Sequence, residues 1–155
     1  MLVGVISDTH GLLRNEAIDA LRGSATIIHA GDVGKAAVLE RLRGIAPVIA
    51  VRGNIDTEPW AASLPESAIV AAGTHRLLVL HDLSQLAVDP VQAGLAAVVF
   101  GHSHKPSIEK RAGVLYLNPG SAGPRRFRLP TTLARLAVSP ACLEPEIIAL
   151  PVGQT

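Results

Sequence analysis

The first hundred residues alternate apolar runs with segments of helical periodicity. Apolar runs of strand length cover residues 2–7, 25–29, 47–51 and 96–100. Between them, residues 15–22 and 35–43 space their apolar side chains at helical intervals, and residues 84–93 are expected to form a further helix. Strands that alternate with helices form βαβ units, so the pattern predicts a mostly parallel sheet.

The rest of the chain favours antiparallel strands. Residues 67–72 and 75–80 flank Gly73-Thr74 and are expected to form a β-hairpin, and residues 59–65 a loop or short helical turn. Further short strands are predicted at 108–111, 114–117, 131–138 and 142–150, forming or completing a second sheet. The predicted fold class is therefore α/β, with two packed β-sheets flanked by helices in one domain over residues 1–155.

The amino-acid composition excludes several classes of protein. Hydrophobic residues make up 48% of 155, which is typical of a globular chain. The net charge of +1 provides no overall field that would attract long nucleic acids or an acidic membrane. Cys142 is the one cysteine, which fits a reducing, cytoplasmic compartment, and we expect it to be an inert core thiol. No apolar run approaches the ~18 residues that a membrane span needs.

Polar side chains that bind metals follow five of the apolar runs. They are Asp8 and His10, Asp32, Asn54, His81, and His102 with His104. Ligands gather at the carboxyl ends of the strands in open α/β sheets, so the seven side chains are expected to converge. Gly31, Gly53 and Gly101 each precede one of them, and we expect these glycines to permit tight turns and close approach of the backbone to a phosphate.

The residue types indicate which ions fit. Carboxylate, amide oxygen and imidazole together suit Mn²⁺, Fe, Zn²⁺, Co²⁺ or Ni²⁺ better than Ca²⁺. Seven ligands are too many for one tetrahedral ion, whereas two ions that share a carboxylate can use them all. Two ions roughly 3.5–4 Å apart can bind both the attacking oxygen and the phosphoryl oxygens.

Five short motifs in this order resemble the calcineurin-like metallophosphoesterase superfamily. They are Asp8-Thr9-His10, Gly31-Asp32, Gly53-Asn54-Ile55-Asp56, His81, and Gly101-His102-Ser103-His104. The short chain and the segment 117–121 (Leu-Asn-Pro-Gly-Ser) look like the compact YfcE-like phosphodiesterase branch. The resemblance covers residues 2 to about 136 and implies an αββα sandwich.

The resemblance also implies a division of the ligands. One metal ion would be held by Asp8, His10, Asp32 and His104, and the other by Asp32, Asn54, His81 and His102. Asp32 would bridge the two, and a hydroxide opposite it would attack a small or nucleotide-like phosphodiester. Asp32, Asn54 and His81 are the expected catalytic residues, and Mn²⁺ is the expected metal, with Ni²⁺, Fe, Zn²⁺ and Co²⁺ as alternatives. Relatives are often dimers or larger, so a homo-oligomer is also compatible with the resemblance.

Two positions depart from the family pattern. Many members carry a histidine after the asparagine of the Gly-Asn motif, where it can contact phosphate or protonate the leaving oxygen, and here that residue is Ile55. Glycine usually follows the lone histidine, and here Asp82 follows His81. Asp82 could orient His81 or simply face solvent.

Structural readings compete with the functional ones. Asp8 and Asp32 could cap helices, Asn54 could be a plain turn residue, and His81 could be structural. His29 and His75 are expected to be structural, Trp60 to pack its loop or line the substrate cleft, and segment 118–121 to support the histidine loop. A basic cluster, Arg125, Arg126 and Arg128, is expected to be solvated or to clamp a polyanionic substrate.

Three other functions remain open at this point. The small subunit of the retromer coat resembles the same fold but is regarded mainly as a scaffold, so a non-catalytic protein-interaction role is the first. A phosphomonoesterase and a nuclease are the others, and the lack of a basic, aromatic-rich surface argues against a long nucleic-acid substrate.

Overall fold

Two five-stranded mixed sheets form the structure, a computed structural model that describes residues 1–126 and 128–152. The first sheet has the order β10-β9-β1-β2-β3 and the second the order β4-β5-β6-β8-β7. The strands of the first sheet are β1 (Leu2–Ile6), β2 (Thr26–His29), β3 (Val48–Ala50), β9 (Thr132–Val138) and β10 (Leu143–Ala149). Those of the second are β4 (Ser67–Ala72), β5 (His75–Leu80), β6 (Ala97–Val99), β7 (Ser107–Arg111) and β8 (Val114–Asn118).

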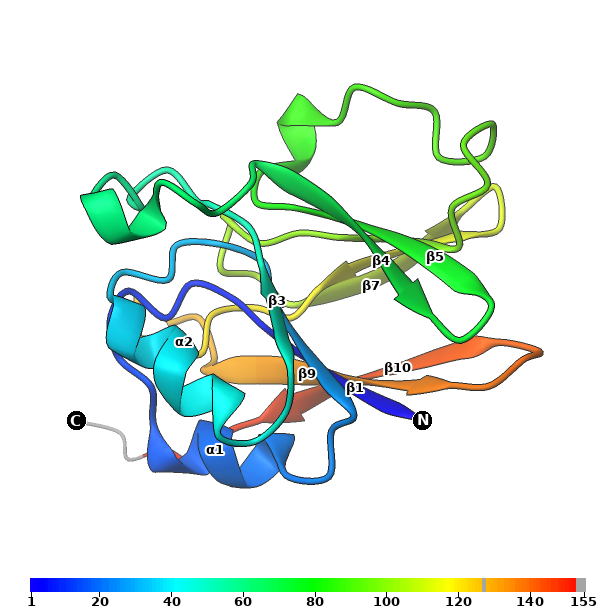
Figure 1. The fold of residues 1–155 in the computed structure, drawn as a ribbon. Helices are drawn as coiled ribbons and strands as arrows, with labels where there is room; N and C mark the ends of the chain where they lie inside the picture. Colours follow the sequence, from blue (N-terminus) through cyan, green and yellow to red (C-terminus); the bar gives the residue numbers. More distant parts are fainter. Residues whose placement is uncertain (127, 153–155) are drawn as a thin grey trace.

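The sheets stack face to face, and both long helices cover the outer face of the first sheet (Figure 1). Between the sheets lies an apolar layer that includes Val3, Val5, Leu77, Val99 and Leu117. Alternation along β1 sends Val3 and Val5 into this layer and Ile6 toward the helices. The predicted fold class of two packed sheets flanked by helices is confirmed.

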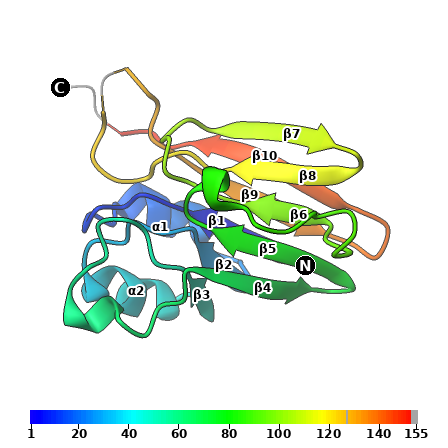
Figure 2. The same cartoon turned by 90° about the horizontal axis from the view of Figure 1, so that it is seen from above.

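The helices α1 (Asn15–Leu21) and α2 (Ala36–Arg43) bury one face each. Leu21 and Leu42 are fully buried in the layer between the helices and the first sheet. The two βαβ crossovers place β1, β2 and β3 in parallel. Figure 2, seen from above, shows the strands of the second sheet side by side in front of them. Within the described residues, no helix is long and apolar enough to cross a membrane.

The expected helix over residues 84–93 is wrong. Only a short 3₁₀ turn (η2, Leu83–Gln85) forms there, and Leu86 is already extended. Pro90 disfavours helical backbone at Asp89, and Val88 and Val91 are about half exposed, so this segment has no buried apolar face to stabilise a helix. The other expected helical turn does form, as η1 (Pro59–Ala61).

The C-terminal strands divide between the sheets. β7 and β8 complete the second sheet, where β8 pairs in parallel with β6. β9 and β10 return to the first sheet, and β9 pairs antiparallel with β1. The expectation that all the late strands build the second sheet is therefore only half right.

Candidate metal centre

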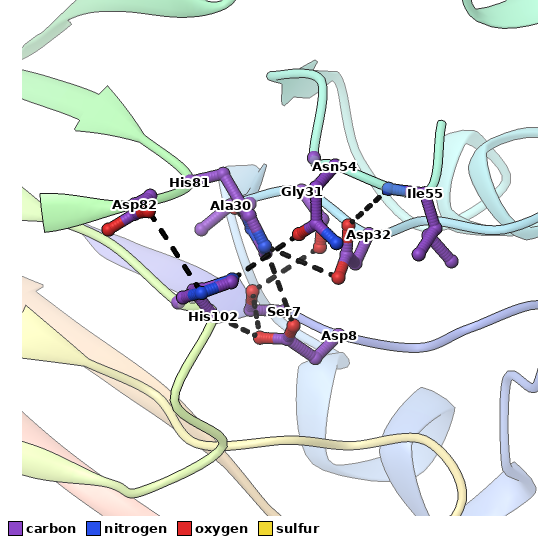
Figure 3. A network of polar contacts seen from close by, with 12 residues as sticks. Ser7, Asp8, Ala30, Gly31, Asp32, Asn54, Ile55, His81, Asp82 and His102 are labelled. Atoms are coloured by element: carbon purple, nitrogen blue, oxygen red, sulfur yellow. Dashed lines mark hydrogen bonds and ion pairs between the residues drawn. The ribbon is translucent and has the colours of Figure 1, made fainter. Parts of the chain in front are cut away.

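The seven side chains predicted from the sequence lie at the carboxyl ends of strands from both sheets. Asp8 and His10 follow β1, Asp32 follows β2, Asn54 follows β3, His81 follows β5, and His102 and His104 follow β6. Because β1–β3 are parallel and β5 is parallel to β6, these loops meet at one edge. Figure 3 shows Asp8, Asp32, Asn54, His81 and His102 turned toward one another.

One group of donors surrounds Asp8. Asp8 Oδ1 lies 3.9 Å from His10 Nε2 and 3.4 Å from His104 Nε2. The ligand atoms of these three residues all lie within 4.8 Å of one another. One small cation can bridge that spacing, because metal–nitrogen and metal–oxygen bonds are about 2.0–2.2 Å long.

A second group includes Asp32 and His81. Asp32 Oδ2 lies 3.3 Å from His81 Nε2 and 3.5 Å from His10 Nε2, so this carboxylate stands between the two groups. Asp8, Asp32 and His81 also have ligand atoms within 4.8 Å of one another. Asp32 Oδ2 is therefore within 3.5 Å of one donor from each group.

The Asn54 amide completes the second group. One of its terminal atoms lies 3.1 Å from His81 Nε2, 3.2 Å from Asp32 Oδ2 and 3.3 Å from His102 Nδ1. A nitrogen at that place donates to these acceptors. An oxygen there faces only lone pairs, an arrangement that a cation between them stabilises.

Unpaired buried atoms support a metal in this place. Among the described residues, Asp8 Oδ1 and His10 Nε2 are buried without a hydrogen-bond partner, although both belong to charged or strongly polar groups. An unsatisfied buried polar group costs about 1–3 kcal/mol, and more if it is charged. A cation that accepts both lone pairs removes this cost, so the donor set fits a divalent metal.

The protonation states also suit metal binding. Burial alone would raise the pKa of Asp8, but the proximity of the His10 ring, the hydrogen bond from Ser7 and the attraction of His81 and His104 outweigh it and hold this pKa below its ordinary value. Burial likewise opposes ionisation of Asp32, and hydrogen bonds from His81 and the Ile55 N–H lower the pKa of Asp32. His81 Nδ1 lies 2.8 Å from the Ala30 carbonyl oxygen, to which it donates, so Nε2 is the ring nitrogen that faces Asp32. Burial would lower the pKa of His81, but its hydrogen bonds to Asp32 and Ala30 raise this pKa, and a bound metal ion would displace the proton between Nε2 and Asp32.

Five of the seven side chains stand on strained backbone. Positive φ angles occur at Asp8 (56°), His10 (47°), Asp32 (56°), His102 (74°) and His104 (64°). Such angles are uncommon outside glycine, cost of order 1–3 kcal/mol each, and cluster at functional sites. The loops therefore need neighbours that hold them in place.

The glycines before these residues lie in direct contact with side chains of the centre. A Cβ on Gly53 would collide with Asp32 N and Oδ1, and one on Gly31 would lie 2.7 Å from His81 Nδ1. A Cβ on Gly101 would lie 2.7 Å from Asp8 Oδ2. Glycine is required because the side chains of the centre pack directly against these backbones.

Buried polar side chains brace the loops. The Asp56 carboxylate accepts the backbone N–H groups of Val33, Gly34 and Gly53 at 2.9–3.1 Å. Asn118 donates to the Gly101 carbonyl oxygen at 3.2 Å and to Ser103 Oγ at 3.1 Å. Segment 118–121 thus contacts the histidine loop as expected, whereas the bracing by Asp56 was not anticipated, although the Gly-Asn-x-Asp motif contains it.

Asp8 and Asp32 are not helix caps, and Asn54 combines a place in a turn with contact to the centre. The N-caps of α1 and α2 are Arg14 and Lys35, and neither makes a side-chain capping bond, so Asp8 and Asp32 do not cap these helices. Asn54 does lie in a turn, closed by a bond from the Asp56 N–H to the Gly53 carbonyl oxygen. Its side chain nevertheless points into the centre.

Asp82 contacts a different histidine from the one that adjoins it in sequence. Asp82 Oδ2 lies 3.9 Å from His102 Nε2, and Asp82 Oδ1 accepts hydrogen bonds from the N–H and the hydroxyl of Ser84. The ring of His102 therefore lies between the Asp82 carboxylate and Asn54. Asp82 does not orient His81, and it is only partly exposed to solvent.

A cleft of about 620 Å³ adjoins the centre on the side of Asn54, His81 and His102. Its walls include Arg52, Thr57, Glu58, Glu66, Asp82 and Gln85. Arg52 Nη2 pairs with Glu66 Oε1 at 3.2 Å. This cleft has room for a small molecule beside the centre.

The remaining candidate residues lie outside the cleft. Trp60 packs in the layer beside the helices, consistent with holding its loop down. Arg125, Arg126 and Arg128 are exposed; the charge of Arg126 adds to the effect of burial in lowering the pKa of His104. Cys142 is exposed and contacts Ser139, so its expected place in the core is wrong: it lies in the β9–β10 turn.

Comparisons with known proteins agree with this geometry. Residues 1–140 match the model of the calcineurin-like phosphoesterase superfamily domain. The chain is 32% identical to a probable metallophosphoesterase of Methanothermobacter thermautotrophicus, over 96% of this chain and 92% of that protein. It is 31% identical to the phosphodiesterase YfcE of Escherichia coli K12, over 74% of this chain and 76% of that protein.

Solved structures share the fold. An archaeal phosphodiesterase superposes with a TM-score of 0.80 at 23% identity, and the superposition covers 96% of this chain and 100% of the archaeal chain. Vps29 of Chaetomium thermophilum superposes with a TM-score of 0.77 at 19% identity, and the superposition covers 97% of this chain and 100% of the Vps29 chain. Because both sequence identities are below 25%, these two similarities establish the shared fold alone.

Proposed function

The chain belongs to the calcineurin-like phosphoesterase superfamily, and we propose that it is a metal-dependent phosphodiesterase that acts on a small or nucleotide-like diester. The observation that carries this proposal is the convergence of Asp8, His10, Asp32, His81 and His104, whose ligand atoms form two overlapping groups that include the buried, unpaired Asp8 Oδ1 and His10 Nε2. The relative named as a phosphodiesterase supports the type of ester.

The distances support a division of the donors between two cations. Asp8, His10, Asp32 and His104 would hold one, and Asp32, Asn54, His81 and His102 the other. Mn²⁺ suits this mixture of nitrogen and oxygen donors, as do Ni²⁺, Fe, Zn²⁺ and Co²⁺. Two bound cations would lower the pKa of a water molecule and neutralise charge on the phosphate.

The protein's own contribution is to orient these donors and the ester. The hydrogen bond from His81 Nδ1 to Ala30 fixes the ring so that Nε2 faces Asp32. The cleft beside Asn54 and His102 is where an ester substituent would lie, and about 620 Å³ accommodates a substituent of nucleotide size or smaller.

Ile55 favours particular substrates. Its side chain is 40% exposed beside Asn54, and only its backbone N–H contacts Asp32, at 3.1 Å. An imidazole at this position would protonate the leaving oxygen, and isoleucine cannot. We therefore infer that diesters with stable leaving groups react faster than monoesters with poor ones.

Turnover of bis(p-nitrophenyl) phosphate by the purified protein with Mn²⁺ tests the proposal. We expect hydrolysis that EDTA abolishes and that Asp32→Asn reduces by at least a hundredfold. Asp19→Asn is the matched control, because Asp19 is 71% exposed on α1 and pairs only with Arg22. Absence of turnover for diesters and monoesters with every first-row metal would overturn the proposal.

A scaffold role is the second candidate, and the fold shared with Vps29 favours it. A scaffold needs no metal, so we expect drift at the ligand positions. All seven positions here carry donor side chains that face one centre. Metal analysis of protein purified without added metal separates the two functions: close to two equivalents supports the enzyme, and none supports the scaffold.

A further inference from the structure

His29 is a fully buried, titratable side chain outside the seven proposed ligands. It lies at the end of β2, three residues before Asp32, with no exposed surface. Its Nδ1 lies 3.1 Å from the Gly31 N–H nitrogen, and its Nε2 lies 3.0 Å from Thr9 Oγ1. Thr9 Oγ1 is also 2.9 Å from the Val33 carbonyl oxygen.

These contacts determine where each proton lies. The Gly31 N–H can only donate, so His29 Nδ1 is an acceptor and the ring hydrogen is on Nε2. Nε2–H then donates to Thr9 Oγ1, whose own hydrogen goes to the Val33 carbonyl oxygen. Burial lowers the pKa of His29 to about 4, against the attraction of nearby aspartates, so the ring is neutral at pH 7.

The chain of bonds joins two loops that carry proposed ligands. Thr9 lies between Asp8 and His10, and Gly31 directly precedes Asp32. Asp8, His10 and Asp32 all have positive φ angles. Backbone bonds from Asp8 N to Gly31 O and from His10 N to Asp32 O, both 3.0 Å, run beside the side-chain link. The main chains of the two loops are thus already adjacent, and the side-chain link adds a further connection between them.

We propose that His29 is a positioning residue of the metal centre, whose neutral ring fastens Thr9 of the Asp8–His10 loop to Gly31 of the Asp32 loop. The proposal goes beyond the proposed function because it concerns how the donors are held, whichever ester is cleaved. Residues that orient metal ligands typically change metal affinity by 10–100-fold when they are replaced.

Two substitutions break the link from opposite ends. Thr9→Val keeps the shape of the side chain and removes its hydroxyl, whereas Thr9→Ser keeps the hydroxyl. His29→Asn leaves an acceptor for the Gly31 N–H on a side chain too short to reach Thr9. Leu42→Ala, in α2 and away from the centre, is the control for a loss of stability without a change in the link.

Titration of metal-free protein with Mn²⁺ in a calorimeter, at a temperature where every variant is folded, provides the readout. We expect Thr9→Val and His29→Asn each to weaken Mn²⁺ binding at least tenfold, and the double variant to bind no more weakly than the worse single variant. Thr9→Ser and Leu42→Ala should bind like the wild type. If His29→Asn does not fold, the Thr9→Val and Thr9→Ser pair still decides.

Three results would overturn the inference. They are a Thr9→Val variant that binds Mn²⁺ with wild-type affinity, losses of affinity that add in the double variant, and a wild-type protein that binds no Mn²⁺. Metal binding that follows the expected series, in a protein that hydrolyses no phosphate ester, would overturn only the proposed function.

Discussion

Removing the charge of Asp56 should loosen the metal centre without touching a proposed ligand. The carboxylate is 2% exposed. Oδ2 accepts from Val33 N at 3.1 Å and Gly53 N at 2.9 Å, and Oδ1 accepts from Gly34 N at 2.9 Å. These bonds connect the loop after Asp32 to the loop that carries Asn54.

Asp56→Asn is almost isosteric, so its effect can be worked out from the bonds alone. The best orientation keeps the oxygen at the two N–H groups of Val33 and Gly53 and turns the amide nitrogen against the Gly34 N–H. One charge-assisted bond, worth about 1.5–3 kcal/mol, is lost, and two others fall to about 1 kcal/mol each. The Gly34 N–H is only partly buried and regains some hydration, so we expect a net loss of about 3 kcal/mol.

Thermal unfolding of the metal-free protein measures this loss. For a chain of this length, each 1 kcal/mol shifts Tm by about 2–4 °C, so Tm should fall by about 6–12 °C. Mn²⁺ binding should weaken as well, because Asp32 and Asn54 lose their common support. The control Asp19→Asn should stay within about 2 °C of the wild type. An equally small shift in Asp56→Asn would refute the assignment of Asp56 as a brace.

Three further predictions follow from single positions. Because burial holds the pKa of His29 at about 4 in the folded protein, against 6.5 for the unfolded chain, the unfolded state takes up this proton first. His29 alone should lower the unfolding free energy by about 3 kcal/mol from pH 7 to pH 4, as measured by urea unfolding of metal-free protein from the difference between the wild-type and His29→Asn profiles; parallel profiles would contradict a buried neutral ring. Ile55→His should raise the ratio of monoesterase to diesterase rates at least tenfold, because it supplies a leaving-group acid, and an unchanged ratio would mean that residue 55 does not face the ester. Gly53→Ala should abolish Mn²⁺ binding in calorimetry, since the alanine Cβ would overlap Asp32. Retained binding would show that the loop around residue 53 can shift to accommodate a methyl group.

The position of the centre could be predicted from sequence because it depends on local patterns. Each apolar run sets the direction of a strand, and in parallel strands the residues that follow must come out at the same edge. Asp8, Asp32 and Asn54 satisfy this rule in the first sheet, and His81 and His102 satisfy it in the second. That these two edges adjoin each other was implied by the family resemblance and is visible only in the fold.

The predictions from sequence are wrong where the structure of a segment depends on residues far away in the chain. Nothing in residues 132–138 specifies pairing with β1 in place of the second sheet, since an alternating strand can add to either exposed edge. The segment around Val88 and Val91 has apolar side chains at helical spacing, but no neighbouring element covers them, and Pro90 interrupts the backbone. The expected core position of Cys142 follows from residue type alone, whereas the tight turn between β9 and the edge strand β10 exposes it.

The backbone strain bears on whether the centre serves catalysis or is a remnant in a scaffold. Outside the centre, positive φ occurs among described non-glycine residues at Ala112, where the turn between β7 and β8 requires it. At Asp8, His10 and Asp32 no such hairpin explains the angle, and the buried bonds of Asp56 and His29 hold the loops in place. Strain of order 1–3 kcal/mol per residue gives no benefit to a protein that binds nothing there, so a scaffold would tolerate substitutions that relax it. The ligand types, the strained angles and the braces occur together, and this combination supports the proposed metal-dependent enzyme over the scaffold.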